Sequence, residues 1–177
     1  MKTVIVYTSA HHGNTKKLVD AVAAEYDIET IDAMKNKEAD LTGYDCIGIA
    51  SGIAYSKYYP QMIEFIEENL PENKKVFFMH TAASPRENHA SDVKAITDER
   101  GCESLGTYFC KGFNTYGPFK LIGGIGKGHP TADECSAAVA FFGEMIRRQG
   151  NENVLEDHYK NNRDNERTWR DTEMGAG

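Results

Sequence analysis

Clustered cysteines, long apolar runs and an excess of positive charge are all missing from this sequence. The four cysteines are scattered and form no Cys-x-x-Cys pair, which excludes a zinc ribbon or a thioredoxin-type redox motif and predicts buried thiols. No apolar run approaches the ~20 residues that a membrane helix needs. With 27 acidic against 20 basic residues, the net charge is −7. This balance argues against nucleic acid or an anionic membrane as a partner and favours partners with basic surfaces.

The beginning of the sequence also lacks the pattern of a secretory signal. Met1 and Lys2 lead straight into an apolar run, with no small-residue cleavage site, so we expect a cytoplasmic protein. A length of 177 residues favours a single domain, predicted over residues 1–150. From residue 151 the chain becomes polar, with few apolar anchors, and we expect residues 151–177 to form a tail.

Short apolar runs alternate with amphipathic segments along the predicted domain. Such alternation predicts an α/β fold, in which a parallel sheet is covered by helices on both faces. The predicted strands are Val4–Tyr7, Ile28–Ile31, Cys46–Ala50, Val76–His80 and Ser104–Phe109. The predicted helices are Asn14–Glu25, Pro60–Asn69, Ala90–Gly101 and Ala132–Arg148. Thr131 and Glu134 have the spacing of a capping box at the start of the last helix.

The loop Thr8–Thr15 joins the first strand to the first helix and contains no Lys or Arg. A helix N-terminus presents unpaired N–H groups that favour a phosphate, and hydroxyls on Thr8, Ser9 and Thr15 add hydrogen-bond donors. The missing lysine excludes a Walker A loop. The later Gly124-x-Gly-x-Gly128 run lacks the dinucleotide-binding spacing. For the His11–His12 pair we expect no metal, because adjacent histidines point apart and no acidic or Cys partner is near.

Three loops leave the carboxyl ends of the predicted strands, where open parallel sheets bind ligands. They are Thr8–Thr15, Ser51–Tyr59 and Thr81–Pro85. Residues 111–130 contain six glycines and two prolines, so we expect an irregular functional segment that reaches the same place. Tyrosines and phenylalanines near these loops predict a site for a flat aromatic ligand. The candidates for stacking are Tyr55, Tyr58, Tyr59, Phe113 and Tyr116.

On these motifs residues 1–148 resemble the flavodoxin family. The stretch Tyr7–Thr15, which ends in Gly-Asn-Thr, is similar to the family's phosphate loop, and Ser51–Tyr55 is similar to the loop after the third strand. Within residues 112–130, Gly112–Lys120, Gly123-Gly124 and Lys127–Pro130 resemble a block found in one group of flavodoxin-like proteins. The resemblance implies a flavodoxin-like three-layer sandwich, with a five-stranded parallel sheet of order 2-1-3-4-5 and bound FMN. The implied cofactor-binding residues are Thr8, Ser9, Ala10, His11, His12, Gly13, Asn14, Thr15, Ser51, Gly52, Ile53, Ala54, Tyr55, Thr81, Ala82, Ala83, Ser84, Phe113 and Tyr116.

The resemblance leaves two functions open. The first is an FMN-dependent electron carrier between redox proteins with basic surfaces, such as reductases and iron–sulfur enzymes, with Gly52 offering a backbone carbonyl that can turn toward the flavin. The second is an NAD(P)H-dependent FMN quinone reductase, which needs an additional substrate pocket. A phospho-receiver module is rejected, because Thr8, Ser9 and Ser51 occupy the places where that module carries acidic residues.

Overall fold

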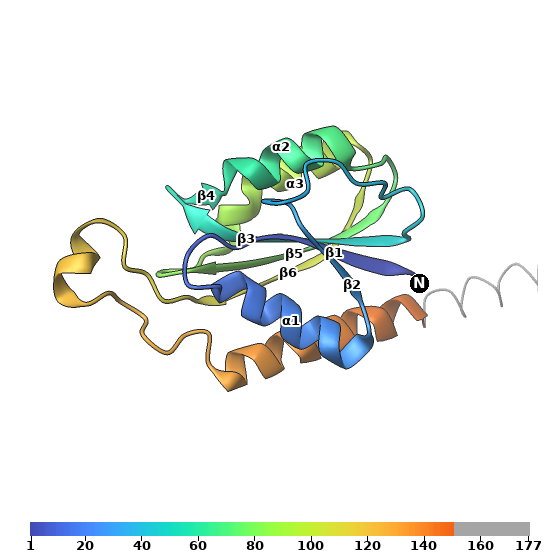
Figure 1. The fold of residues 1–177 in the computed structure, drawn as a ribbon. Helices are drawn as coiled ribbons and strands as arrows, with labels where there is room; N and C mark the ends of the chain where they lie inside the picture. Colours follow the sequence, from blue (N-terminus) through green and yellow to red (C-terminus); the bar gives the residue numbers. More distant parts are fainter. Residues whose placement is uncertain (151–177) are drawn as a thin grey trace, which may run out of the picture. The chain divides into compact units, whose positions relative to one another are not determined.

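The computed structural model describes residues 1–150 (Figure 1). The predicted polar tail lies outside this range. Residues Met1–Phe142 form one compact unit. None of the helices formed by the described residues is both long and apolar enough to cross a lipid bilayer.

A parallel sheet in the order β2-β1-β3-β5-β6 forms the centre of the unit. Its strands are β1 (Thr3–Thr8), β2 (Glu29–Asp32), β3 (Cys46–Ala54), β5 (Lys75–Ala82) and β6 (Glu103–Lys111). The order equals the predicted 2-1-3-4-5, because the two-residue strand β4 (Lys57–Tyr58) pairs only with β3, in antiparallel fashion. The flavodoxin-like α/β sandwich is therefore confirmed.

Helices cover both faces of this sheet (Figure 1). One face carries α2 (Pro60–Asn69) and α3 (Ser91–Glu99), and the other carries α1 (Asn14–Tyr26) and the helix that begins at residue 132. The middle of β1 is completely buried on both faces, as its continuous apolar run predicts. Phe77 packs its ring against Phe142, with the centroids 5.4 Å apart.

The predicted helix boundaries agree with the structure except at α3. There the chain first makes a 3₁₀ turn, η1 (Glu87–Ala90), before α3 begins at Ser91. The capping box is confirmed: the Glu134 N–H donates to the Thr131 hydroxyl (3.2 Å), and the Thr131 N–H donates to the Glu134 carboxylate (2.7 Å). The same carboxylate lies 2.7 Å from His129 Nδ1. This network fixes the point where the long glycine-rich segment returns to the sandwich.

The predicted loop Ser51–Tyr59 is wrong in its boundaries, because most of these residues belong to strands. Strand β3 continues to Ala54, and the chain reverses through Tyr55 and Ser56 into β4. Both turn residues have left-handed backbone angles, with φ of 51° and 66°. Tight hairpin turns require this conformation, but Asn-Gly or Asp-Gly is the usual sequence signal for it. A Tyr-Ser turn carries no such signal, so the hairpin could not be read from the sequence.

Candidate functional site

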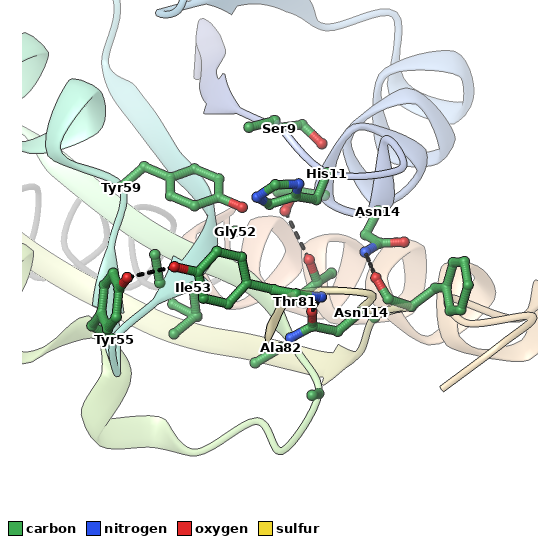
Figure 2. Close-up of a pocket in the computed structure, with 17 residues that line it drawn as sticks. Ser9, His11, Asn14, Gly52, Ile53, Tyr55, Tyr59, Thr81, Ala82 and Asn114 are labelled. Carbon is green, nitrogen blue, oxygen red and sulfur yellow. Dashed lines mark hydrogen bonds between the residues drawn. The ribbon is translucent and has the colours of Figure 1, made fainter. Parts of the chain in front are cut away.

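A cavity of about 300 Å³ opens at the carboxyl ends of β1, β3 and β5 (Figure 2). Its walls come from the loop after β1, the β3–β4 hairpin, the end of β5 and the segment that follows β6. Among residues 1–150, no Asp, Glu, Lys or Arg lines it. The lining residues are Ser9, Ala10, His11, Asn14, Thr15, Gly52, Ile53, Ala54, Tyr55, Tyr59, Thr81, Ala82, Ala83, Gly112, Phe113, Asn114 and Tyr116.

At one end of the cavity the loop after β1 makes a tight turn before α1. His12 and Gly13 both adopt left-handed angles, with φ of 56° and 66°, immediately before α1 begins at Asn14. The Ser9 hydroxyl accepts the Lys16 N–H at 3.2 Å. Within the described part of the chain, the N–H groups of residues 10–13 donate no hydrogen bond. Free N–H groups beside a helix N-terminus are suited to a phosphate.

Two buried hydroxyls support the cavity from behind. The Thr8 and Ser51 hydroxyl oxygens are 2.8 Å apart, and Ser51 also accepts the Tyr59 N–H at 3.1 Å. Ser51 donates in turn to the Gly52 carbonyl at 2.7 Å. The expectation of a freely turning Gly52 carbonyl is therefore wrong, because this carbonyl accepts the Ser51 hydroxyl and Gly52 itself pairs with Thr81 in the sheet. Thr8 and Ser51 position the wall without lining it.

Tyr59 forms one wall by lying directly over Gly52. A Cβ atom at position 52 would be 2.7 Å from the Tyr59 ring. The His11 ring meets the Tyr59 ring edge-on, with centroids 6.3 Å apart, so the phosphate loop and the wall are in contact (Figure 2). Burial raises the pKa of the Tyr59 hydroxyl, which keeps this ring neutral.

Asn14 joins the first helix to the segment after β6. Its Nδ2 donates to the Phe113 carbonyl at 2.8 Å, and a Cβ at Gly112 would be only 2.9 Å from that nitrogen. The Asn14 Oδ1 is buried without a hydrogen-bond partner. A buried acceptor left unpaired costs about 1–3 kcal/mol. Nearby, the Thr15 and Thr81 hydroxyls are 2.9 Å apart.

Two exposed tyrosines meet at the mouth of the cavity. The hydroxyl oxygens of Tyr55, on the hairpin, and Tyr116, after β6, are 2.7 Å apart, with the rings edge-to-face (Figure 2). Their side chains are 83% and 59% exposed, so both rings are accessible from solvent. Tyr58 was the wrong stacking candidate. It is buried in the core, where its hydroxyl donates to the Met79 carbonyl at 3.2 Å.

The segment after β6 closes on itself before it reaches the last helix. Asn114 and Ile125 exchange two backbone hydrogen bonds of 2.9 Å each around the 3₁₀ turn η2 (Gly117–Ile122). His12 ties this segment to the phosphate loop through a 2.9 Å contact between its Nε2 and the Thr115 hydroxyl. The irregular character predicted for residues 111–130 is confirmed.

Most of the predicted site residues meet at this one cavity. Five do not line it: Thr8, His12, Gly13, Ser51 and Ser84. Gly112 and Asn114 line it, although the sequence pattern did not select them as binding residues, and Tyr59 was selected only as a stacking candidate. The Gly-Phe-Asn-Thr-Tyr-Gly run around Asn114 was the available signal, but nothing in it specifies which side chains turn inward.

Outside the cavity, we searched the described residues for metal-ligating clusters and reactive thiols. Among them, no group of three or more His, Cys, Asp or Glu side chains is placed to hold a metal ion. Cys46, Cys102 and Cys110 are buried, as predicted, and burial raises the pKa of the Cys46 and Cys110 thiols to about 12. These two thiols stay protonated, which leaves the cavity as the chemically distinctive feature of this unit.

The sequence and the fold of this protein are similar to those of known proteins. Residues 4–107 match the family model of the flavodoxin domain. An uncharacterized protein of Methanocaldococcus jannaschii is 34% identical over 149 residues, covering 83% of this chain and 99% of the relative. A flavodoxin from the domain Archaea has a TM-score of 0.60 at 16% identity, over 82% of this chain and 97% of that one. The apo form of an NADH:FMN oxidoreductase has a TM-score of 0.53 at 13% identity, over 82% and 88%.

At these identities the two solved structures show a shared fold alone. The family model covers more than half of the chain, and the archaeal relative matches it over nearly the whole predicted domain. Together with the sheet order and the loop that precedes α1, these matches show that the chain belongs to the flavodoxin domain family.

Proposed function

We propose that this protein binds FMN and carries electrons between redox partners. The observation that supports this most strongly is the continuity of the cavity. It joins a neutral anion-binding turn at the start of α1 to an uncharged space flanked by tyrosines. FMN has the matching shape, with a phosphate at one end of a short chain and a flat ring at the other.

The phosphate end would be held by neutral donors. The unpaired N–H groups of residues 10–13 face the start of α1, where the helix dipole adds a partial positive charge. Lys16, the nearest lysine, is engaged with the Asp20 carboxylate at 2.6 Å. Binding therefore rests on hydrogen bonds and not on an ion pair.

The ring end would be held by the aromatic and small residues of the other walls. Tyr59 presents its ring beside Gly52, Tyr55 and Tyr116 flank the mouth, and Ala82 and Ala83 leave room along β5. Bound FMN supplies the capacity to take up and release electrons, and the residues that line the cavity orient it and exclude water.

An electron carrier fits the cavity better than a reductase does. Its volume of about 300 Å³ is at the low end for small-molecule sites, which run from about 300 to 1,000 Å³. A reductase must also accommodate a nicotinamide and an electron acceptor beside the ring. No charged side chain of the described residues lines the cavity to orient such substrates.

The first test is binding of FMN and riboflavin to the flavin-free protein, followed by flavin fluorescence. The two ligands share the ring and differ in the phosphate. Charge-assisted hydrogen bonds contribute about 1.5–3 kcal/mol each, so we expect FMN to bind at least about tenfold more tightly. Equal affinities would contradict the phosphate site, and failure to bind either ligand would contradict the proposed function.

The second test separates the carrier from the reductase. The FMN-loaded protein is reduced anaerobically in small steps with dithionite, and in parallel with NADH and NADPH, while absorbance spectra are recorded. A carrier takes up electrons one at a time from dithionite and reacts slowly with either nicotinamide. Rapid two-electron reduction by NADH or NADPH, with turnover on an added quinone, would establish the reductase instead.

A further inference from the structure

The segment after β6 differs in charge from the rest of the chain. Between Glu103 and Asp133 the sequence contains no acidic residue, although the whole chain has 27. The same stretch carries Lys111, Lys120 and Lys127. All three lysines are exposed, and within the described residues none of them forms an ion pair.

Several acidic residues at the same end of the sheet are paired with neighbours. Asp92, at the start of α3, lies 2.8 Å from the Lys57 ammonium, and Asp20 lies 2.6 Å from that of Lys16. Glu134 is bound to His129 and to the capping N–H of Thr131. Lys17 in α1 and Arg86 after β5 are exposed and have no acidic partner among the described residues. The segment after β6 is therefore locally basic, although Asp133, at the start of the last helix, is exposed and has no ion-pair partner among the described residues.

Many acidic side chains of the described residues lie at the other end of the sheet. Glu67 and Glu68 lie in the last turn of α2, Glu72 precedes β5, and Asp98 and Glu99 end α3. These positions are beside the amino ends of the strands, on the side opposite to the cavity.

Exposed apolar side chains lie within or beside the basic segment after β6. Leu121 and Ile122 of η2 are 89% and 71% exposed, and Tyr55 and Tyr116 are exposed at the cavity mouth. Figure 1 shows this segment extending past the carboxyl ends of the strands. Grouped exposed apolar side chains mark association sites. An apolar centre with a charged rim is the usual anatomy of a protein interface.

We propose that this basic mouth, formed by Lys111, Lys120 and Lys127 of the segment that carries Tyr116, Leu121 and Ile122, docks an acidic redox protein. This inference rests on the proposed function, because it places the partner at the edge of the FMN cavity. The net charge of the chain predicts basic partners, but the charges next to the cavity govern the docked complex. Lysines on the rim steer the encounter, and the apolar centre supplies the affinity.

The test compares two small redox proteins of opposite charge, an acidic plant-type ferredoxin and a basic cytochrome c. Each is immobilised, and association of the FMN-loaded protein is followed by surface plasmon resonance at low and high salt. We expect association with ferredoxin to be the faster at low salt, and to slow about tenfold between 20 and 300 mM salt. Faster association with cytochrome c, or no association with either protein, would overturn the proposal.

Matched variants locate the effect on the surface. Lys120→Gln combined with Lys127→Gln removes two charges from the basic mouth. Lys2→Gln combined with Lys37→Gln removes two exposed charges at the other end of the sheet, where Lys2 precedes β1 and the Lys37 carbonyl accepts the Asn69 amide of α2. We expect the first pair to slow association with ferredoxin about threefold or more, and the second pair to leave it unchanged. Equal effects of the two pairs would reduce the proposal to a net-charge effect and overturn it.

Two further measurements keep the interpretation unambiguous. Unchanged FMN affinity in both variant pairs separates failure of docking from failure of the proposed function. Sedimentation of the FMN-loaded protein tests whether a second copy occupies the basic mouth. A dimer that the Lys120→Gln, Lys127→Gln variant dissociates would assign this surface to self-association and overturn the docking of an acidic partner.

Discussion

At the scale of single residues, the cavity depends on small side chains that let larger ones approach. Because Gly52 has no side chain, the Tyr59 ring can pack directly over it, and Gly112 allows the Asn14 amide to approach in the same way. Gly48 in β3 does the same for Phe77 beneath the sheet, since a Cβ there would lie 2.4 Å from the Phe77 ring. A larger side chain at one of these glycines would displace the aromatic or amide side chain packed against it. We therefore expect each substitution to affect mainly the part of the structure that this neighbour supports.

Gly52→Ala tests the Tyr59 wall. The added Cβ would lie 2.7 Å from the Tyr59 ring, so the ring must shift out of its present place. Overpacking of this kind typically costs about 1–3 kcal/mol, and we expect FMN affinity to fall about tenfold or more. The measurement is FMN binding by fluorescence, together with urea unfolding of the flavin-free variant.

Gly43→Ala is the matched control, because a Cβ at this exposed position meets no atom within 4 Å. It should leave both the FMN affinity and the unfolding free energy unchanged. Wild-type FMN affinity in the Gly52→Ala variant would show that Tyr59 does not shape the binding cavity.

At the scale of secondary structure, the strands and helices could be predicted because each is specified locally. Buried strands are continuous apolar runs, Pro60 begins a helix, and the Thr131–Glu134 capping box sits where the sequence places it. The β3–β4 hairpin was missed because its left-handed turn uses Tyr55 and Ser56. Its formation is decided by the pairing of β3 with β4 and not by turn-forming residues.

The closed segment between Gly112 and Gly126 was foreseen only as irregular. Gly124 adopts φ of 91°, and a Cβ there would be 2.5 Å from the Phe113 ring. Gly124→Ala should therefore open the Asn114–Ile125 pairing. We expect faster amide hydrogen exchange across residues 112–126 and weaker FMN binding. The exchange of β1, β3 and β5 should not change, because the segment lies outside the sheet.

Gly123→Ala provides the control for backbone strain at this element. Gly123 also has a left-handed angle, φ of 80°, but a Cβ there meets no atom within 4 Å. The two variants share the cost of an alanine at positive φ and differ in the clash with Phe113. Equal exchange rates in both would mean that strain alone, and not the packing of Phe113, closes the segment.

At the scale of the whole molecule, the sequence predicts where the site lies but not how it is assembled. The sheet order brings three loops together at one edge, so the Thr8–Thr15, Ser51–Tyr55 and Thr81–Ala83 residues could be selected in advance. The place of Asn114 depends on contacts between segments far apart in the chain, such as His12 with Thr115 and Asn14 with Phe113, and the place of Tyr59 depends on the β3–β4 hairpin. Local patterns carry no information about such contacts.

The stability of the whole molecule should depend on pH through His80. This side chain is fully buried in β5, with Nε2 2.9 Å from the Arg86 carbonyl and its ring stacked on Phe109. Burial lowers its pKa to about 4, against about 6.5 in an unfolded chain. Between these values the unfolded state binds a proton that the folded state does not. Stability is therefore complete above about pH 6.5 and falls as the pH drops toward 4.

Urea unfolding at pH 7.5 and pH 5 measures this effect directly. A pKa lowered from about 6.5 to about 4 corresponds to a loss of about 2 kcal/mol in unfolding free energy between these two pH values. Burial also lowers the pKa of the neighbouring His89, which adds to the loss.

We expect His80→Gln, whose amide can still donate to the Arg86 carbonyl, to lose much less unfolding free energy on acidification, although it starts from a lower stability. His11→Gln, which removes an exposed histidine, should retain the wild-type loss. An identical acid-induced loss in His80→Gln and the wild type would mean that His80 is not the buried group that sets the acid limit of the fold.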